Sequence, residues 1–215
     1  MAITEIYVIR HGESIANLEH RACGHFDTPL SELGIKQAEV TANALRDIKF
    51  DKIYSSDLSR AYDTALPNAR MRGMEVERRP LLREIFLGEW EYMQVDDIVA
   101  HYGSEAYHGG WRDNFGLYVI PGGEGAVACG QRITEEVKRL CPKEGGRILI
   151  VSHGAAIRTL CLNALGTPPE QYAKRLPYPS NASYTRLSFD GERLELLEYS
   201  QESHLEKIGI TKVNW

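Results

Sequence analysis

Four side chains that can bind or attack a phosphate group follow apolar stretches of the sequence. Arg10 and His11 end the first stretch, Arg60 comes shortly after the second, and His153 follows a later run, Arg147–Val151. Arginine binds two phosphate oxygens at once, and a neutral imidazole can attack phosphorus and carry the phosphoryl group covalently. Donors fixed around that group stabilise its charge without a metal ion. These residues predict a pocket for a phosphate dianion that needs neither a metal nor another cofactor.

Hydrolysis of a phosphate ester also requires a proton for the leaving alcohol. Glu84, just past the third predicted strand, is the candidate general acid. Taken alone, Arg10-His11-Gly12 is a weak signal, and a solvated strand end with an incidental histidine explains it equally well. The other cationic residues of the set favour the phosphate pocket.

Strands and helices alternate along the chain and place these residues at one edge of a sheet. Short apolar runs predict strands at 3–9, 50–56, 74–79 and 147–151. Helices are predicted at 31–46, from 57 past 65, at 124–140 and at 155–165, and an antiparallel edge hairpin at 184–199. Strand–helix units with right-handed crossovers predict a mainly parallel α/β sheet. Such sheets bind ligands at the carboxyl ends of their strands.

Local signals mark two of the helix starts and one helix interior. Ser31 and Asp57 are predicted N-caps, because their side-chain oxygens can accept hydrogen bonds from the first turn. Pro67 is predicted to kink or restart the second helix, because proline has no N–H and clashes with the preceding turn.

Residues 86–121 lack a clear period and are rich in aromatic side chains. We predict a single domain over residues 1–215, with 86–121 inserted as a cap over the site. A small satellite core under a long loop is the other interpretation. His108 and Arg112 would be the polar side chains of the cap that contact the substrate. Replacing Trp111 and Arg112 by alanine would then change the order in which substrates are preferred.

Composition narrows the class of partner. The formal net charge of -5, from 25 basic and 30 acidic residues, gives no support for binding nucleic acid or anionic membranes. The four cysteines lack metal-site spacing and disulfide-scaffold density, which predicts reduced, packed thiols. No apolar run approaches the roughly 18 residues of a membrane span, and no signal peptide is recognisable, so we expect a cytoplasmic protein. On that basis we discount the glycosylation sequon at Asn181.

Five blocks of the chain carry motifs in a fixed order: Arg10-His11-Gly12-Glu13-Ser14 with Asn17, Ser55-Ser56-Asp57-Leu58-Ser59-Arg60-Ala61, Leu82-Arg83-Glu84, Pro121-Gly122-Gly123-Glu124 with Arg132, and Val151-Ser152-His153-Gly154. Together they strongly resemble the histidine phosphatase superfamily, also called the phosphoglycerate mutase-like family. The resemblance implies a three-layer α/β sandwich with a mostly parallel central sheet, an antiparallel edge and an inserted cap region.

The resemblance also implies a role for each site residue. In this assignment His11 becomes phosphorylated, Glu84 is the acid and base, Arg10, Arg60 and His153 bind the transferring group, and Ser14, Asn17 and Gly154 add phosphate contacts. A helix N-cap is an equally good interpretation of Ser14. Two further residues have supporting interpretations: Arg83 would hold Glu84 in place, and Glu124 would orient an arginine.

The segment after Glu84 resembles phosphatases more than cofactor-dependent mutases. We therefore expect a metal-independent phosphomonoester hydrolase acting on a small phosphorylated metabolite. Mutase-type phosphoryl transfer and a non-catalytic protein that binds phosphorylated ligands stay open as alternatives. Tyr92 stands where such phosphatases commonly have glycine, and Gly125 replaces a usual serine. Homodimers are common in the family, so the resemblance is also compatible with a dimer.

Overall fold

The structure, a computed structural model, describes residues 2–211. Its strands are β1 (Thr4–Arg10), β2 (Lys52–Ser55), β3 (Val76–Arg78), β4 (Gly146–Ser152), β5 (Tyr184–Phe189) and β6 (Leu194–Gln201). Its α-helices are α1 (Ile15–Leu18), α2 (Glu32–Ala44), α3 (Ser59–Arg72), α4 (Val95–Tyr102), α5 (Ala126–Leu140), α6 (Gly154–Ala164) and α7 (Tyr172–Arg175). A π-helix, η3 (Glu105–Arg112), and the short 3-10 turns η1 (Pro80–Leu82), η2 (Gly88–Trp90), η4 (Pro169–Gln171) and η5 (Ser203–Leu205) complete the list.

The six strands form one sheet in the order β3-β2-β4-β1-β5-β6. The four strands from β3 to β1 are parallel, and β5 and β6 form the predicted antiparallel edge. Between β1 and β4 the register pairs Arg10 with Ser152. The α/β class is confirmed, and His11 and His153 each lie one residue beyond a strand end, on neighbouring strands.

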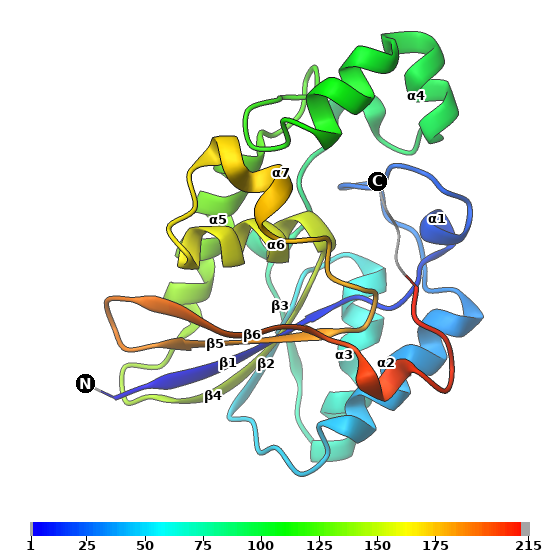
Figure 1. Cartoon of the computed structure of the whole chain (residues 1–215). Helices are drawn as coiled ribbons and strands as arrows, with labels where there is room; N and C mark the ends of the chain where they lie inside the picture. The colour runs from blue at the N-terminus through cyan, green and yellow to red at the C-terminus, as the bar shows by residue number, and fades with distance from the viewer. Residues whose placement is uncertain (1, 212–215) are drawn as a thin grey trace.

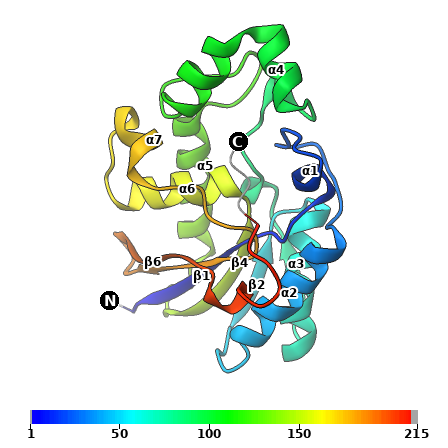
Figure 2. The same cartoon turned by 45° about the vertical axis from the view of Figure 1, so that its right-hand side comes forward.

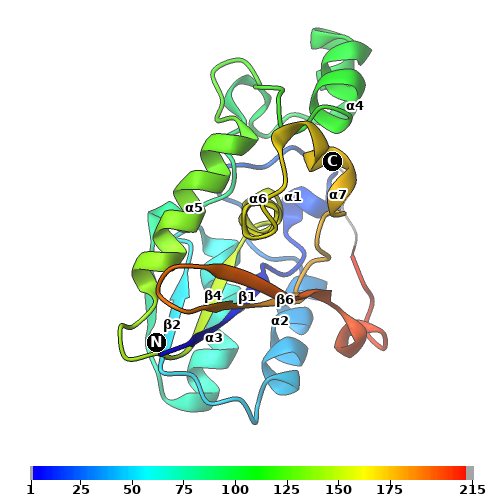
Figure 3. The same cartoon turned by 60° about the vertical axis from the view of Figure 1, so that its left-hand side comes forward.

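Helices cover both faces of the sheet. Figures 1 and 3 show α2 and α3 on one face and α5 and α6 on the other. Side chains of β1 alternate between two cores: Ile6 and Val8 pack on the α5–α6 side, and Tyr7 and Ile9 on the α2–α3 side. Burial on both faces explains why these strands are continuous apolar runs. The predicted three-layer sandwich is confirmed.

Two predictions about α3 are corrected by the structure. The helix runs through Pro67 without interruption, so it does not restart there, and a kink at Pro67 stays a prediction. The alanines on either side of Pro67 are buried in the core, and this packing outweighs the local cost of the proline. Asp57 is not the N-cap. Leu58 holds that position without a side-chain bond, because the Asp57 carboxylate accepts two hydrogen bonds from Arg83, at 2.7 and 2.6 Å.

Several aromatic side chains of residues 86–121 pack around Trp90, which is 1% exposed. Four rings lie with their centroids 5.9 to 6.3 Å from its own, those of Tyr102, Tyr107, Trp111 and Tyr118. This cluster is continuous with the core on the α5–α6 side of the sheet, so it is not a separate satellite core. Figure 2 shows α4 above α1, on the side toward which β1 points. That the segment is a cap inserted into a single domain stays a prediction.

All four cysteines are free, and Cys23, Cys129 and Cys161 are buried, which agrees with packed thiols. Within residues 2–211 no helix combines the length and the apolar character that crossing a bilayer would need.

Candidate active site

Two imidazole rings meet at the carboxyl ends of β1 and β4. Because these strands are parallel neighbours in register, the ring centroids of His11 and His153 lie 5.1 Å apart. The backbone N–H of His11 donates to the carbonyl of Ser152 at 3.0 Å, which extends the strand pairing by one residue. Both histidines are buried, with 4% and 0% of their surface exposed. The sheet register thus brings two predicted residues into contact.

One backbone carbonyl sets the tautomer of His11. Its Nδ1 lies 2.7 Å from the Gly12 oxygen, which can only accept a hydrogen bond, so Nδ1 carries the proton. Burial lowers the pKa of His11 well below 6.5, and the charges of Arg60 and Arg10 lower it further. The ring is therefore neutral near pH 7, and its Nε2 has the lone pair that a nucleophile needs.

Arg10 reaches the same place from the end of β1. Its Nη1 donates to the Pro179 carbonyl at 2.6 Å. A Cβ at Gly154 would lie 3.3 Å from Arg10 Nε, so glycine leaves room for the guanidinium at the start of α6. Burial lowers the pKa of Arg10 to about 10, and the charge of Glu84 acts in the opposite direction. Arg10 is therefore a buried cation at neutral pH.

Arg60, in the first turn of α3, is 1% exposed. Its Nη1 donates to the Phe26 carbonyl at 2.9 Å and its Nη2 to the Gly24 carbonyl at 2.7 Å. The nearest carboxylate, that of Asp27, is 3.9 Å away and largely exposed. Backbone dipoles rather than a close acidic partner hold this cation, so its charge is available to an anion.

Several buried polar atoms at this site have no partner. Within residues 2–211, Nδ1 and Nε2 of His153 and Nε of Arg10 lack hydrogen bonds. Burial lowers the pKa of His153 well below 6.5, with Arg60 and His11 as the next largest causes. Buried polar atoms nearly always have partners in folded proteins. A phosphate group would supply acceptors to Arg10 and to the protonated nitrogen of His153.

Glu84 lies against the first turn of α6. Its Oε1 accepts from the N–H of Ala156 at 2.9 Å and of Ile85 at 2.9 Å, and its Oε2 accepts from Ala155 at 3.0 Å. It is 9% exposed. The turn η1 carries Glu84 from β3 to this position, so the predicted acid does reach the edge of the sheet where the histidines lie.

Ser14 is the N-cap of α1. Its Oγ accepts from the N–H of Asn17, and the Asn17 Oδ1 accepts from the N–H of Ser14, each at 3.2 Å. The cap interpretation of Ser14 is confirmed, and its phosphate contact stays a prediction. Asn17 Oδ1 also accepts from Asn181 Nδ2 at 3.0 Å. Because the side-chain oxygen of Asn17 accepts both of these hydrogen bonds, its side-chain NH₂ group is the part that could donate to a phosphate.

Sequence reasoning missed Asn181, which it treated only as a glycosylation sequon. This residue is fully buried, and its Nδ2 donates to the carbonyls of His11 at 3.1 Å and Gly12 at 3.3 Å. Thr64 holds the same loop from α3 by accepting from the N–H of Gly12 at 3.0 Å. No local sequence signal links residues 170 positions apart, so only the fold could identify Asn181.

The structure shows the hydrogen-bond partners of Arg83 and Glu124, the two residues with predicted supporting roles. Arg83 contacts Asp57 rather than the Glu84 carboxylate. Glu124 does orient an arginine: its oxygens accept from Arg132 at 2.8 and 2.7 Å. Arg132 also donates to the carbonyls of residues 81, 83 and 84, and so fixes the backbone that carries Glu84.

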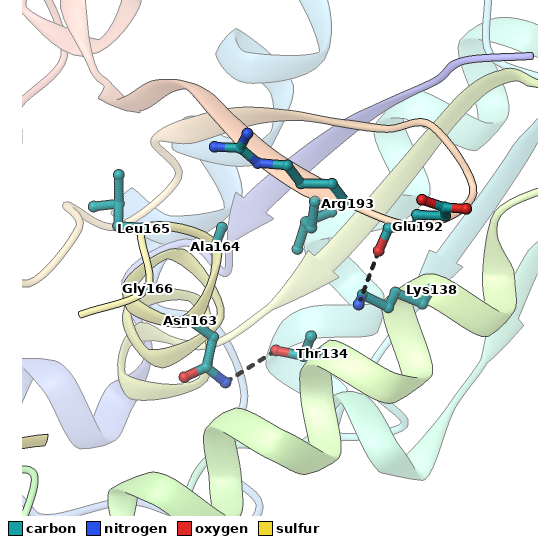
Figure 4. Close-up of a pocket in the computed structure, with 9 residues that line it drawn as sticks. Thr134, Lys138, Asn163, Ala164, Leu165, Gly166, Glu192 and Arg193 are labelled. Carbon is teal, nitrogen blue, oxygen red and sulfur yellow. Dashed lines mark hydrogen bonds between the residues drawn. The ribbon is translucent and has the colours of Figure 1, made fainter. Parts of the chain in front are cut away.

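The cavity in Figure 4 lies away from these residues. It has a volume of about 470 Å³ and is lined by α5, by the C-terminal end of α6 and by the turn before β6. His153 caps the opposite end of α6. None of the candidate site residues lines this cavity, so we assign it no part in phosphate chemistry.

The chain is similar to known proteins over most of its length. Adenosylcobalamin/alpha-ribazole phosphatase of Escherichia coli is 33% identical over 166 residues, which cover 77% of this chain and 81% of that protein. Phosphoglycerate mutase-like protein 4 of Arabidopsis thaliana is 32% identical, with 96% and 89% covered. The native structure of a mycobacterial glucosyl-3-phosphoglycerate phosphatase has a TM-score of 0.82 at 30% identity, with 92% and 99% covered. The family model of the histidine phosphatase superfamily (branch 1) matches residues 6–202, and the chain belongs to this superfamily.

Proposed function

We propose that this protein hydrolyses small organic phosphomonoesters through a phosphohistidine at His11, without a metal ion. The observation that carries the proposal is the neutral His11 ring, with its Nδ1 proton held by the Gly12 carbonyl. Arg10 and Arg60 are both buried, and the charges of both lower the pKa of this nucleophile. A neutral nucleophile at His11 and fixed cations at Arg10 and Arg60 are together suited to attack on a phosphate dianion.

In the first step, the Nε2 lone pair of His11 forms a bond to phosphorus, and the bond from phosphorus to the ester oxygen breaks. That oxygen leaves with the bonding pair and takes a proton from Glu84. Arg10, Arg60 and one N–H of His153 hold the three other phosphate oxygens. Their buried positions make these interactions stronger than they would be in water.

In the second step, water attacks the phosphohistidine. Glu84 takes a proton from the water as its oxygen bonds to phosphorus, and the bond from phosphorus to Nε2 breaks. The bonding pair returns to His11, inorganic phosphate leaves, and Glu84 is again protonated. The first-turn amides of α6 hold the carboxyl group in place between the two steps.

Transfer of the phosphoryl group to a second hydroxyl, as in a mutase, is the other candidate. The name of the Arabidopsis relative, which matches 96% of this chain, favours it. The phosphatase names of the Escherichia coli and mycobacterial relatives favour water as the acceptor. These two phosphatases are named for different substrates, so the relatives support the reaction class more than any one substrate.

Phosphate release tests the proposal directly. A panel of phosphomonoesters is incubated with the protein in the presence of a chelator, and inorganic phosphate is measured. We expect release by the wild type and a loss of roughly 10³-fold or more in His11→Ala. The exposed His101 on α4 gives the matched control, and His101→Ala should keep wild-type rates. Release that survives in His11→Ala would refute the proposal, and transfer to an added alcohol without net release would favour the mutase.

A further inference from the structure

Tyr92 has a left-handed backbone conformation, with φ at +64°. This region favours glycine, because the Cβ of other residues crowds the backbone there. Tyr92 therefore holds a backbone conformation that costs free energy for a residue with a large side chain. Strain retained at one residue points to a use for its side chain.

The Tyr92 side chain forms part of a stack at the protein surface. Its ring is stacked on Phe26, with centroids 4.2 Å apart and 20° between the planes. The guanidinium of Arg21 lies over the same ring, 4.8 Å from its centroid. A ring stacked at this distance leaves no room for a guanidinium on the same face, so Phe26 and Arg21 use the two faces of Tyr92. Phe26 ends the stack.

The stack is attached to the candidate active site through residues 24–26. Arg60 donates to the carbonyls of Gly24 and Phe26. Between them, His25 Nε2 lies 2.9 Å from the carbonyl of Glu84. The loop that carries Phe26 therefore contacts both the residue proposed to bind the phosphoryl group and the residue proposed to protonate the leaving alcohol.

Glu91 holds this loop in a fixed position. Its carboxylate accepts from the backbone N–H groups of residues 24, 25 and 26, at 2.8 to 3.2 Å. The N–H of Tyr92 donates to the Ala22 carbonyl at 2.6 Å. The stack is thus built on an anchored loop rather than on a free chain segment.

Phe26 and Phe86 are the exposed phenylalanines of the described chain, at 46% and 37% exposure. Both belong to this region, because the Phe86 ring lies 5.1 Å from that of His25. Exposed aromatic surface beside a polar site is typical of a ligand contact, since it costs free energy while uncovered. A planar ring of the ligand would cover Phe26 and extend the stack.

We propose that Phe26, supported by Tyr92, binds the alcohol part of the substrate and selects phosphomonoesters whose alcohol carries a planar aromatic ring. The inference rests on the proposed function, because it takes the site formed by Arg60 and His11 as the place where the phosphate binds. Ring stacking, rather than apolar contact in general, supplies the preference.

A pair of ligands that differ only in planarity tests this. Benzylphosphonate and cyclohexylmethylphosphonate are not hydrolysed, so calorimetric titration measures their binding whether or not the protein turns over. We expect the wild type to bind the benzyl ligand roughly 3- to 10-fold more tightly. Phe26→Ala and Phe26→Leu should both bring the ratio close to one, since leucine keeps apolar area but not planarity.

Two variants separate this role from a structural one. Tyr92→Gly relieves the backbone strain, so it should lower the benzyl preference without lowering the melting temperature. Tyr62→Ala, which removes another tyrosine with an arginine over its ring, is the control and should keep the ratio. An unchanged ratio in Phe26→Ala, or no benzyl preference in the wild type, would refute the inference. Loss of phosphate release in His11→Ala is a separate result, so the two proposals can fail independently.

Discussion

The protonation state of His11 follows from its immediate neighbours. The Gly12 carbonyl determines which nitrogen carries the proton, and burial beside two arginines keeps the ring neutral. A neutral ring next to buried cations is what a nucleophile for a phosphate dianion requires. The position of the backbone at Gly12 therefore matters for the nucleophile as much as the His11 side chain does, because a shift of the Gly12 carbonyl would alter the tautomer of His11.

Asn181 should act as a positioning residue for this loop. Asn181→Ala removes two hydrogen bonds to the carbonyls of His11 and Gly12, so we expect kcat to fall about 10-fold with a smaller change in KM. Steady-state kinetics on one phosphomonoester measures both constants. Asn163→Ala is the matched control, because this residue bonds Thr134 and Tyr172 at the far end of α6. A fall in kcat of the same size in both variants would mean a general loss of stability instead.

The elements bring distant residues together by simple geometry. β1 and β4 are parallel and in register, so residues that follow them become neighbours although they are far apart in the chain. α3 starts beside the same edge and supplies Arg60, and η1 returns the chain from β3 to place Glu84. Each of the four segments that follow β1, β2, β3 and β4 thus places at least one site residue at the carboxyl edge of the sheet.

Within residues 86–121, the structure changes the expected effect of one substitution. Trp111 is 5% exposed and packs against Trp90 and Phe115, so it supports the segment from inside. Trp111→Ala should lower the free energy of unfolding by about 3–5 kcal/mol, the usual cost of removing a buried aromatic side chain. Urea denaturation measures this value. The exposed neighbour Arg112 is the control, and Arg112→Ala should change it by less than about 0.5 kcal/mol. Similar values for both variants would contradict the packing assignment.

At the scale of the whole molecule, the two buried histidines couple stability to pH. In the folded protein the pKa of His11 and that of His153 are both well below 6.5, chiefly because of burial. In the unfolded chain both rings take up protons as the pH falls through about 6.5. The unfolded state then binds more protons than the folded state, so stability is greatest above pH 6.5 and falls below it.

Urea unfolding at pH 7.5, 6.0 and 5.0 tests this dependence. Each histidine should contribute a loss of about 1.4 kcal/mol per pH unit once the pH is well below 6.5. His153→Gln should remove one of the two contributions, whereas His101→Gln, on the surface, should leave the slope unchanged. The buffer must be free of phosphate, because a bound anion would stabilise the folded state by itself. A slope that His153→Gln does not reduce would contradict the assignment.

The sequence by itself determined the class of fold, the order along the chain of the strands and of the helices that flank the sheet, and the residues that follow the strands at the sheet edge. It did not indicate α4 and η3, which lie in a segment without a clear period. The features that it did determine each depend on a local pattern. Apolar runs predict buried strands, and Arg10, His11 and His153 are placed by the strands they directly follow. The family motifs add Glu84 for the same reason, since it lies a few residues past a strand.

Only the tertiary structure decided how these residues are held and what surrounds them. Asn181 comes 170 residues after His11, and nothing local marks it as a partner of that loop. The sequence marks Tyr92 only as a departure from the family pattern, and its strain and its stacking on Phe26 appear only in three dimensions. Pro67 remains inside a helix because packing overrides a local propensity. Contacts of this kind depend on side chains from distant segments, which a local sequence pattern does not encode.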